Sequence, residues 1–190
     1  GEGLQTELYN TNLVFFKYSA FGQLSRAFID ERLRLSFGLR TDANTYSDVM
    51  SNPLTQISPR LSATFALTGQ MNLNFNVGRY YQLPSYTSLG LRDNEGNYIN
   101  RDNKLKYLAA DHIVGGVELI PDERLQFTVE GFLKSYSDYP FSVADQVPLS
   151  TKSAGYGIFG NEALVSTAVG RAYGFEFMGR ARDFEGLNMV

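Results

Sequence analysis

The stretch Met71-Asn72-Leu73-Asn74-Phe75-Asn76-Val77 alternates strictly between an apolar residue and asparagine. Successive side chains of a β-strand point to opposite faces, so this stretch predicts a strand with one apolar face and one polar face. A noisier version occupies residues 12–29, with Phe15 and Phe21 among the polar positions. The same alternation recurs at residues 33–40, 60–67, 113–119, 125–130 and 173–178. The repeated pattern predicts an all-β chain.

The segments between these strands alternate between short and long. Short connections lie at residues 30–32, 69–70, 122–124 and 184–186, and long ones run over 43–55, 85–107 and 142–167. Gly69-Gln70 fits a two-residue type II′ hairpin, in which the glycine has positive φ. Strands joined by such short turns pair antiparallel. We therefore predict an antiparallel up-and-down meander of about seven strands, with an eighth beginning at residue 187.

The alternation alone does not say which face of the sheet meets water. The expected strands are about 12 to 17 residues long, whereas strands of soluble sheets have a mode of about 5 to 6. Tight turns at one end and long loops at the other are typical of outer-membrane barrels. The sequence therefore favours a segment of a large transmembrane β-barrel. The alternatives are a soluble β-barrel or sandwich that binds an apolar ligand, and a passive outer-membrane porin or adhesin.

Composition narrows the functions that are open to the chain. The 190 residues carry a net charge of −3, which argues against a nucleic-acid partner. There is no cysteine, so neither a disulfide nor a thiolate metal site can form, and there is a single histidine. We expect no catalytic residues, no enzymatic activity, no cofactor and no metal.

Three short patterns are explained better by structure than by chemistry. Residues 155–160 match G-x-G-x-x-G but lack the strand and helix that a dinucleotide site needs, so a glycine-rich loop is expected. The acidic run at 93–97, with Asp102, does not follow the order of an EF-hand loop and predicts a solvated turn. Asp111 and His112 are adjacent in a strand and should point to opposite faces. None of the three predicts a catalytic site.

Four motifs resemble the barrel of TonB-dependent outer-membrane receptors. Ile57-Ser58-Pro59-Arg60-Leu61-Ser62 resembles the start of one strand of that family, and Gly78-Arg79-Tyr80-Tyr81-Gln82-Leu83-Pro84 resembles the end of the next. Residues 130–140 and 170–177 resemble two later strands, in the expected order. The resemblance is greatest to receptors of the Bacteroidetes type.

This resemblance implies a place in the bacterial outer membrane and a role in TonB-dependent nutrient uptake. Residues 1–190 would then be an internal fragment of the barrel, without the plug domain that fills it. The implied partners are outer-membrane lipid, the plug domain and TonB through the parent protein, and a surface lipoprotein. No nucleic acid is expected among them, and the nutrient is not identified.

The alternation also assigns side chains to faces. The polar side, expected to face the lumen, carries charges whose most prominent members are Arg34, Arg40, Arg60, Glu118, Glu130, Glu176 and Arg180. Ligand binding is expected on the loop side, at Tyr80, Tyr81, Tyr86, Arg92 and Tyr98, because tyrosine and arginine combine flat faces with hydrogen-bonding tips. Tyr46, Tyr80, Tyr81, Tyr136 and Tyr139 are predicted to form an aromatic girdle. Arg171 occupies an apolar position, which predicts a place above the bilayer or after a β-bulge.

Overall fold

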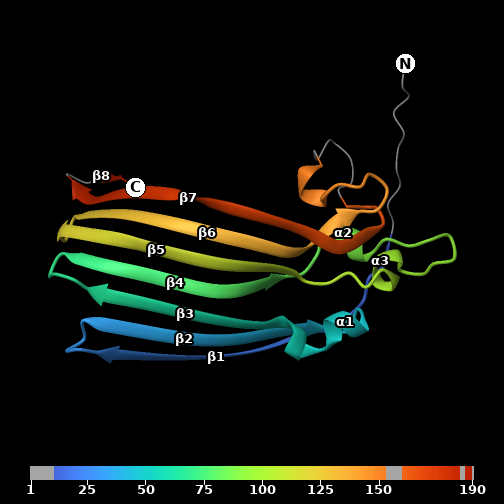
Figure 1. The fold of residues 1–190 in the computed structure, drawn as a ribbon, viewed down its shortest axis with the longest axis horizontal. Coiled ribbons are helices and arrows are strands. Elements are labelled where there is room, and N and C mark those ends of the chain that lie inside the picture. The colour runs from blue at the N-terminus through green and yellow to red at the C-terminus, as the bar shows by residue number, and fades with distance from the viewer. Residues whose placement is uncertain (1–10, 153–159, 185–186, 190) are drawn as a thin grey trace, which may run out of the picture.

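The computed structural model describes residues 11–152, 160–184 and 187–189. Its strands form one sheet in which each strand pairs antiparallel with the next along the chain (Figure 1). The strands are β1 (Lys17–Phe28), β2 (Leu33–Asn44), β3 (Ile57–Ala66), β4 (Met71–Gln82), β5 (Leu108–Asp122), β6 (Leu125–Ser142), β7 (Leu164–Phe184) and β8 (Leu187–Met189). The predicted up-and-down meander is confirmed.

The register carries the sequence alternation across the whole sheet. Phe75 lies opposite Ala63 of β3 and Gly115 of β5, whereas Asn74 lies opposite Thr64 and Gly116. One face therefore collects the leucine, phenylalanine and valine side chains, and we call it the apolar face. The other face, which carries asparagine, serine, threonine and charged residues, is the polar face.

In the described part of the chain, the buried core lies at the loop end of the sheet and does not cover the apolar face. Phe75 is 42% exposed, and Tyr173 and Phe177 on β7 are 81% and 78% exposed. In a soluble sandwich or small barrel these side chains would be the interior. Large apolar side chains left open along several strands mark a surface that is made to meet another apolar phase.

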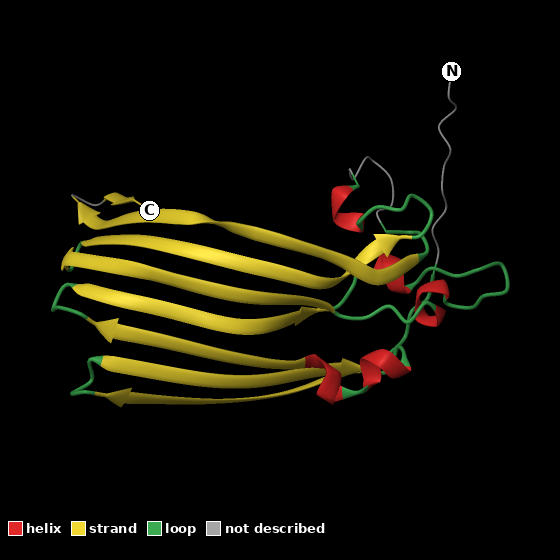
Figure 2. Ribbon diagram, in the orientation of Figure 1, coloured by secondary structure: helices red, strands yellow, loops and turns green. Residues whose placement is uncertain are grey.

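The helices and long loops gather at one end of the sheet, and the tight turns lie at the other (Figure 2). The helical turns are α1 (Asp48–Ser51), η1 (Pro53–Gln56), α2 (Tyr86–Leu89), α3 (Ile99–Asp102) and η2 (Leu149–Thr151). In the part of the chain that the structure describes, no helix is long and apolar enough to cross a membrane. The loop end is where the polypeptide forms its own packed core.

That core joins residues from several loops and strand ends. Its buried members are Tyr46, Met50, Leu89, Leu105, Tyr107, Leu149 and Leu164. Asn100, which is 0% exposed, ties three segments together. Its amide nitrogen donates to the carbonyls of Ser88 and Glu162, and its oxygen accepts from the Leu164 N–H at 2.7 Å. The loops therefore present a packed surface on the rim of the sheet.

One predicted turn is wrong, and one predicted loop lies mostly outside the residues that the structure describes. The short connection predicted between β3 and β4 is present, but its predicted type II′ turn is wrong, because Gly69 does not have positive φ and β3 already ends at Ala66. Instead, the Gln70 N–H donates to the Thr68 hydroxyl, so a side chain shapes the turn where a positive-φ glycine was expected. Residues 155–159 of the glycine-rich motif lie outside the described residues, and Gly160 is buried with a φ of 82°.

Candidate functional site

All seven charged residues predicted for the lumen side share the polar face. Arg34, Thr64, Asn74, Gly116, Glu130 and Glu176 follow one another in register from β2 to β7. Arg60 lies opposite Gly78, and Arg180 lies opposite Gln126. The register therefore confirms that these side chains share a face, whereas the identity of that face as the lumen stays a prediction.

The carboxylates of the polar face differ in their surroundings. Glu118 accepts hydrogen bonds from the amide nitrogens of Asn72 at 2.9 Å and Gln126 at 2.5 Å. Glu130 and Glu176 lie directly opposite each other, and neither forms an ion pair within the part of the chain that the structure describes. Two like charges in directly opposed positions repel each other.

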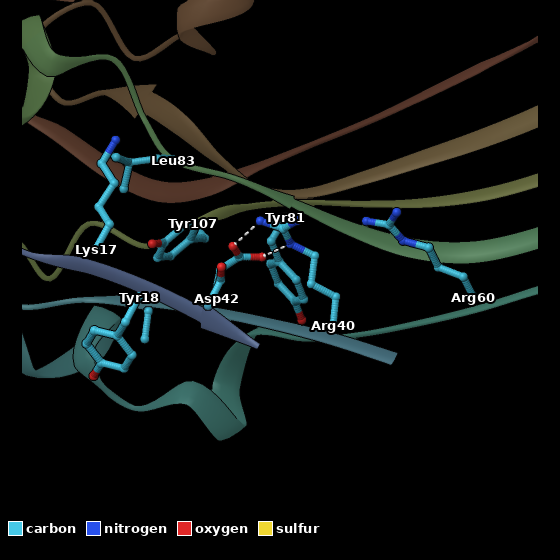
Figure 3. Close-up of a pocket in the computed structure, with 10 residues that line it drawn as sticks. Lys17, Tyr18, Arg40, Asp42, Arg60, Tyr81, Leu83 and Tyr107 are labelled. Carbon is cyan, nitrogen blue, oxygen red and sulfur yellow. Dashed lines mark hydrogen bonds and ion pairs between the residues drawn. The ribbon is translucent and has the colours of Figure 1, made fainter. Parts of the chain in front are cut away.

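A pocket of about 430 Å³ lies at the loop-side ends of β1–β4 (Figure 3). Its lining includes the cations Lys17, Arg40 and Arg60, together with Asp42. Tyr81 and Tyr107 also line it, whereas the Tyr18 ring turns away from Lys17 and its hydroxyl donates to the Ser51 carbonyl (Figure 3). Figure 3 shows Lys17 and Arg60 on either side of the pocket, with Arg40 and Asp42 between them. The pocket combines positive charge with flat aromatic surface.

Only one of the three cations is neutralised by a carboxylate. Arg40 binds Asp42 through two hydrogen bonds of 2.7 and 2.6 Å. The Arg60 guanidinium lies 4.4 Å from the centre of the Tyr80 ring, and the Lys17 ammonium lies 4.7 Å from that of Tyr86 and donates to its hydroxyl. Neither Arg60 nor Lys17 forms an ion pair within the described ranges. The pocket therefore carries a net positive charge that suits an anion.

Aromatic rings extend from this pocket across the polar face. The Tyr80 and His112 rings are 4.7 Å apart, and Tyr136 lies 6.5 Å beyond His112. Tyr139 continues the series at 5.4 Å from Tyr136. The predicted girdle is therefore wrong for Tyr80 and Tyr136, because their even positions place them on the polar face. It is also wrong for Tyr139, which follows a register shift and packs against Tyr136, and for Tyr46, which is buried in the loop core.

The five residues predicted to bind ligand do not form one cluster. Tyr81 lines the pocket, Tyr80 stacks with Arg60 at its edge, and Tyr86 contacts Lys17. Arg92 and Tyr98 lie further along the same β4–β5 connection, where the guanidinium covers the ring at 4.2 Å and both side chains donate to the carbonyl of Asn12. Sequence reasoning did not assign Lys17, Asp42 or Tyr107 to this site, because strand ends from distant parts of the chain meet only in the folded sheet.

The acidic run at 93–97 forms a turn stabilised by its own carboxylate. Asp93 accepts hydrogen bonds from the Glu95 and Asn97 N–H groups at 2.9 and 2.8 Å, and from the Asn97 side chain at 3.1 Å. The bond from the Asn97 side chain is the main reason that the pKa of Asp93 lies below its usual value. This geometry agrees with the predicted solvated turn.

Asp111 and His112 point to opposite faces, as their spacing predicted. The Asp111 carboxylate binds Arg79 on the apolar face at 2.7 and 2.6 Å, whereas the His112 ring stacks on Tyr80 on the polar face. They cannot work as a base and its orienting partner.

A meander of long strands with an open apolar face, a polar face and loops at one end defines the wall of a transmembrane β-barrel. The chain belongs to the TonB dependent receptor-like β-barrel family, whose model matches residues 3–189. It is therefore a segment of an outer-membrane receptor barrel. The Bacteroidetes-type subgroup stays a prediction.

Solved structures show the same fold at low identity. The chain is similar to the ferric enterobactin receptor PfeA of Pseudomonas aeruginosa, with a TM-score of 0.62 and 22% identity over 90% of this chain. For the copper transporter OprC the values are 0.57 and 21% over 89%, and for the siderophore receptor PirA of P. aeruginosa they are 0.59 and 15% over 88%. The chain spans 25%, 27% and 31% of these three proteins. Among curated proteins, none is similar enough in sequence to count as a relative.

Proposed function

We propose that this chain is a wall segment of a receptor that binds an anionic metal chelate and imports it with energy from TonB. The observation that carries the proposal is the pocket at the loop-side strand ends, where Arg60 and Lys17 have no carboxylate partner among the described residues. Tyrosine rings beside two cations without a carboxylate partner suit a flat ligand with negatively charged oxygens. The same ligand class is supported by two similar structures, a ferric enterobactin receptor in complex with enterobactin and a siderophore receptor.

Arg60→Gln in the full-length protein should weaken binding of an anionic ferric chelate about tenfold, since a charge-assisted hydrogen bond contributes roughly 1.5 kcal/mol. Arg60→Lys should weaken it less, because the charge is kept. Affinity is measured by titrating the protein with each member of a panel of ferric chelates and following its tyrosine fluorescence. Arg34→Gln is the matched control, because Arg34 lies on the same face but outside the pocket. Equal affinities for the Arg60→Gln and Arg34→Gln variants would show that the pocket does not bind the chelate.

The proposed orientation places the polar face toward the lumen and its plug domain, and the apolar face toward lipid. The opposed carboxylates of Glu130 and Glu176 support this orientation, because a basic side chain of a plug would relieve their repulsion. The exposed phenylalanine and leucine side chains of the other face suit the acyl chains of the bilayer. No ion pair within the described part of the sheet would compete with the plug for the Glu130–Glu176 pair.

The reactivity of a cysteine at position 176 should show whether the plug domain covers the polar face. In the full-length receptor, Glu176→Cys should react slowly with a membrane-impermeant maleimide, and deletion of the plug domain should raise the rate about tenfold or more, as expected when a buried surface becomes exposed to water. Phe177→Cys, one residue away on the apolar face, should stay unreactive in both proteins because lipid covers it. Fast labelling of position 177 and none of position 176 would show that the apolar face meets water and the polar face meets lipid, the opposite of the proposed orientation.

A further inference from the structure

Arg60 of β3 lies between two glycines on the polar face. Gly38 of β2 is its partner in register on one side, and Gly78 of β4 is its partner on the other. Because β3 pairs with described strands along both of its edges, the sheet around Arg60 is complete. Neither glycine has a positive φ, so the space around each one decides what its lack of a side chain does.

The two glycines differ in what covers them. A Cβ added at Gly78 would lie 3.1 Å from Cγ of Arg60 and 3.3 Å from both Cε2 and the hydroxyl oxygen of Tyr80. A Cβ added at Gly38 would lie 3.9 Å from the Gly22 carbonyl oxygen and 4.0 Å from Cβ of Arg60, which is ordinary contact. The side chains of Arg60 and Tyr80 therefore cross over Gly78, and a methyl group there would push against both.

The Tyr80 ring leans back over Gly78 and packs between two side chains from the neighbouring strands. The guanidinium carbon of Arg60 lies 4.4 Å from the centre of the ring. The His112 ring, which belongs to the partner of Gly78 on β5, lies 4.7 Å away with an interplanar angle of 36°. Arg60, Gly78 and His112 thus form one row across three strands, and the Tyr80 ring lies above the middle of that row.

The Arg60 guanidinium keeps its hydrogen-bonding groups open. Arg60 is exposed, and among the described residues it forms no ion pair and donates no hydrogen bond. Figure 3 shows its side chain ending toward Arg40 and Tyr81 of the pocket. A guanidinium whose direction is fixed by packing loses less conformational freedom when a ligand binds.

We propose that Gly78 and Tyr80, with His112 packed against the Tyr80 ring, are positioning residues that direct Arg60 into the pocket. Tyr80 covers one side of the guanidinium, and the N–H groups are left for a pair of adjacent anionic oxygens on the ligand. The inference rests on the proposed binding of an anionic chelate at this pocket, and it adds how one of the two cations is held. It also gives Tyr80 a role other than the predicted ligand contact, since its ring supports Arg60.

The chelate affinity of the full-length protein tests the role of Gly78. Gly78→Ala should weaken binding about fivefold, less than Arg60→Gln does, because the displaced guanidinium keeps its charge. Gly38→Ala is the matched control and should leave the affinity unchanged. In the Arg60→Gln background, Gly78→Ala should cause no further loss. Additive losses, or equal losses in the two glycine variants, would overturn the positioning role.

Substitutions of Tyr80 separate support of Arg60 from direct contact with the ligand. Tyr80→Phe keeps the ring beneath the guanidinium and should keep the affinity for the chelate. Tyr80→Leu removes the ring and should weaken binding as much as Gly78→Ala does. Equal losses in the two Tyr80 variants would show that the hydroxyl group itself binds the ligand, and would overturn the supporting role of the ring.

A fluorine label separates this inference from the proposed function, because it needs no ligand. With fluorotyrosine incorporated at position 80 of the full-length protein, the fluorine NMR resonance should shift in Arg60→Gln and in Gly78→Ala but not in Gly38→Ala. An unchanged resonance in Gly78→Ala would overturn the positioning of Arg60. Shifted resonances together with full chelate affinity in Arg60→Gln would confirm the packing and overturn the pocket as the binding site.

Discussion

Phe75→Arg is expected to lower the free energy of unfolding in a bilayer by about 2 to 4 kcal/mol, the cost of a cationic side chain on the lipid face near the middle of the membrane. Phe75 lies on the apolar face of β4, between Leu73 and Val77, and its ring is 42% exposed in the isolated segment. The position is four residues from Arg79, the one charged residue of β4. Arginine there cannot reach the headgroups without distorting the side chain or the membrane.

Asn76→Arg is the matched control for this change. Asn76 is the next residue on the same strand, is exposed, and lies on the polar face opposite Ser62 and Val114. We expect it to change the unfolding free energy by about 1 kcal/mol or less, the central value for single substitutions, because the polar face does not meet the hydrocarbon. Denaturant unfolding of the full-length protein from lipid vesicles measures both variants. Equal stability of the two would contradict the assignment of the apolar face to lipid.

The strands were the most predictable part of the fold, because a single physical rule controls them. The alternation at 71–77 determines both the strand and its two faces, and the observed register keeps Asn74 and Phe75 on opposite sides. The turn at Gly69 was less predictable, since either a positive-φ glycine or the Thr68 hydroxyl can close it. The choice depends on where β3 ends, which the local sequence does not specify.

The site was only partly predictable, for a different reason. Parity within a strand places Arg40 and Arg60 on one face, but it does not show that Lys17 and Tyr107 meet them at the rim. Tyr98 and Arg92 have the composition of a binding site, yet they contact each other and the carbonyl of Asn12. Long-range packing of the loops decides which tyrosines remain open, and no local pattern encodes it.

Gly116→Ala is expected to destabilise the sheet by about 1 to 3 kcal/mol, the usual cost of overpacking a well-packed site. An added Cβ would lie 2.6 Å from the Val129 carbonyl oxygen and 2.6 Å from Cγ of Glu130, both on the neighbouring strand β6. A side chain can rotate away, but a backbone oxygen moves only if β5 and β6 separate. The hydrogen bonds of that strand pair would then lengthen.

The adjacent glycine provides the control. An added Cβ at Gly115 would lie 3.9 Å from the Asn74 carbonyl oxygen and 3.9 Å from the Phe75 ring, which is ordinary contact. Gly115→Ala should therefore change the unfolding free energy by about 0.5 kcal/mol or less in the same vesicle assay. Adding Glu130→Ala to Gly116→Ala separates the two clashes, because it removes Cγ and leaves the Val129 oxygen in place. We expect most of the loss to persist in the double variant, whereas full recovery would show that the Glu130 side chain, not the backbone of β6, requires glycine at this position.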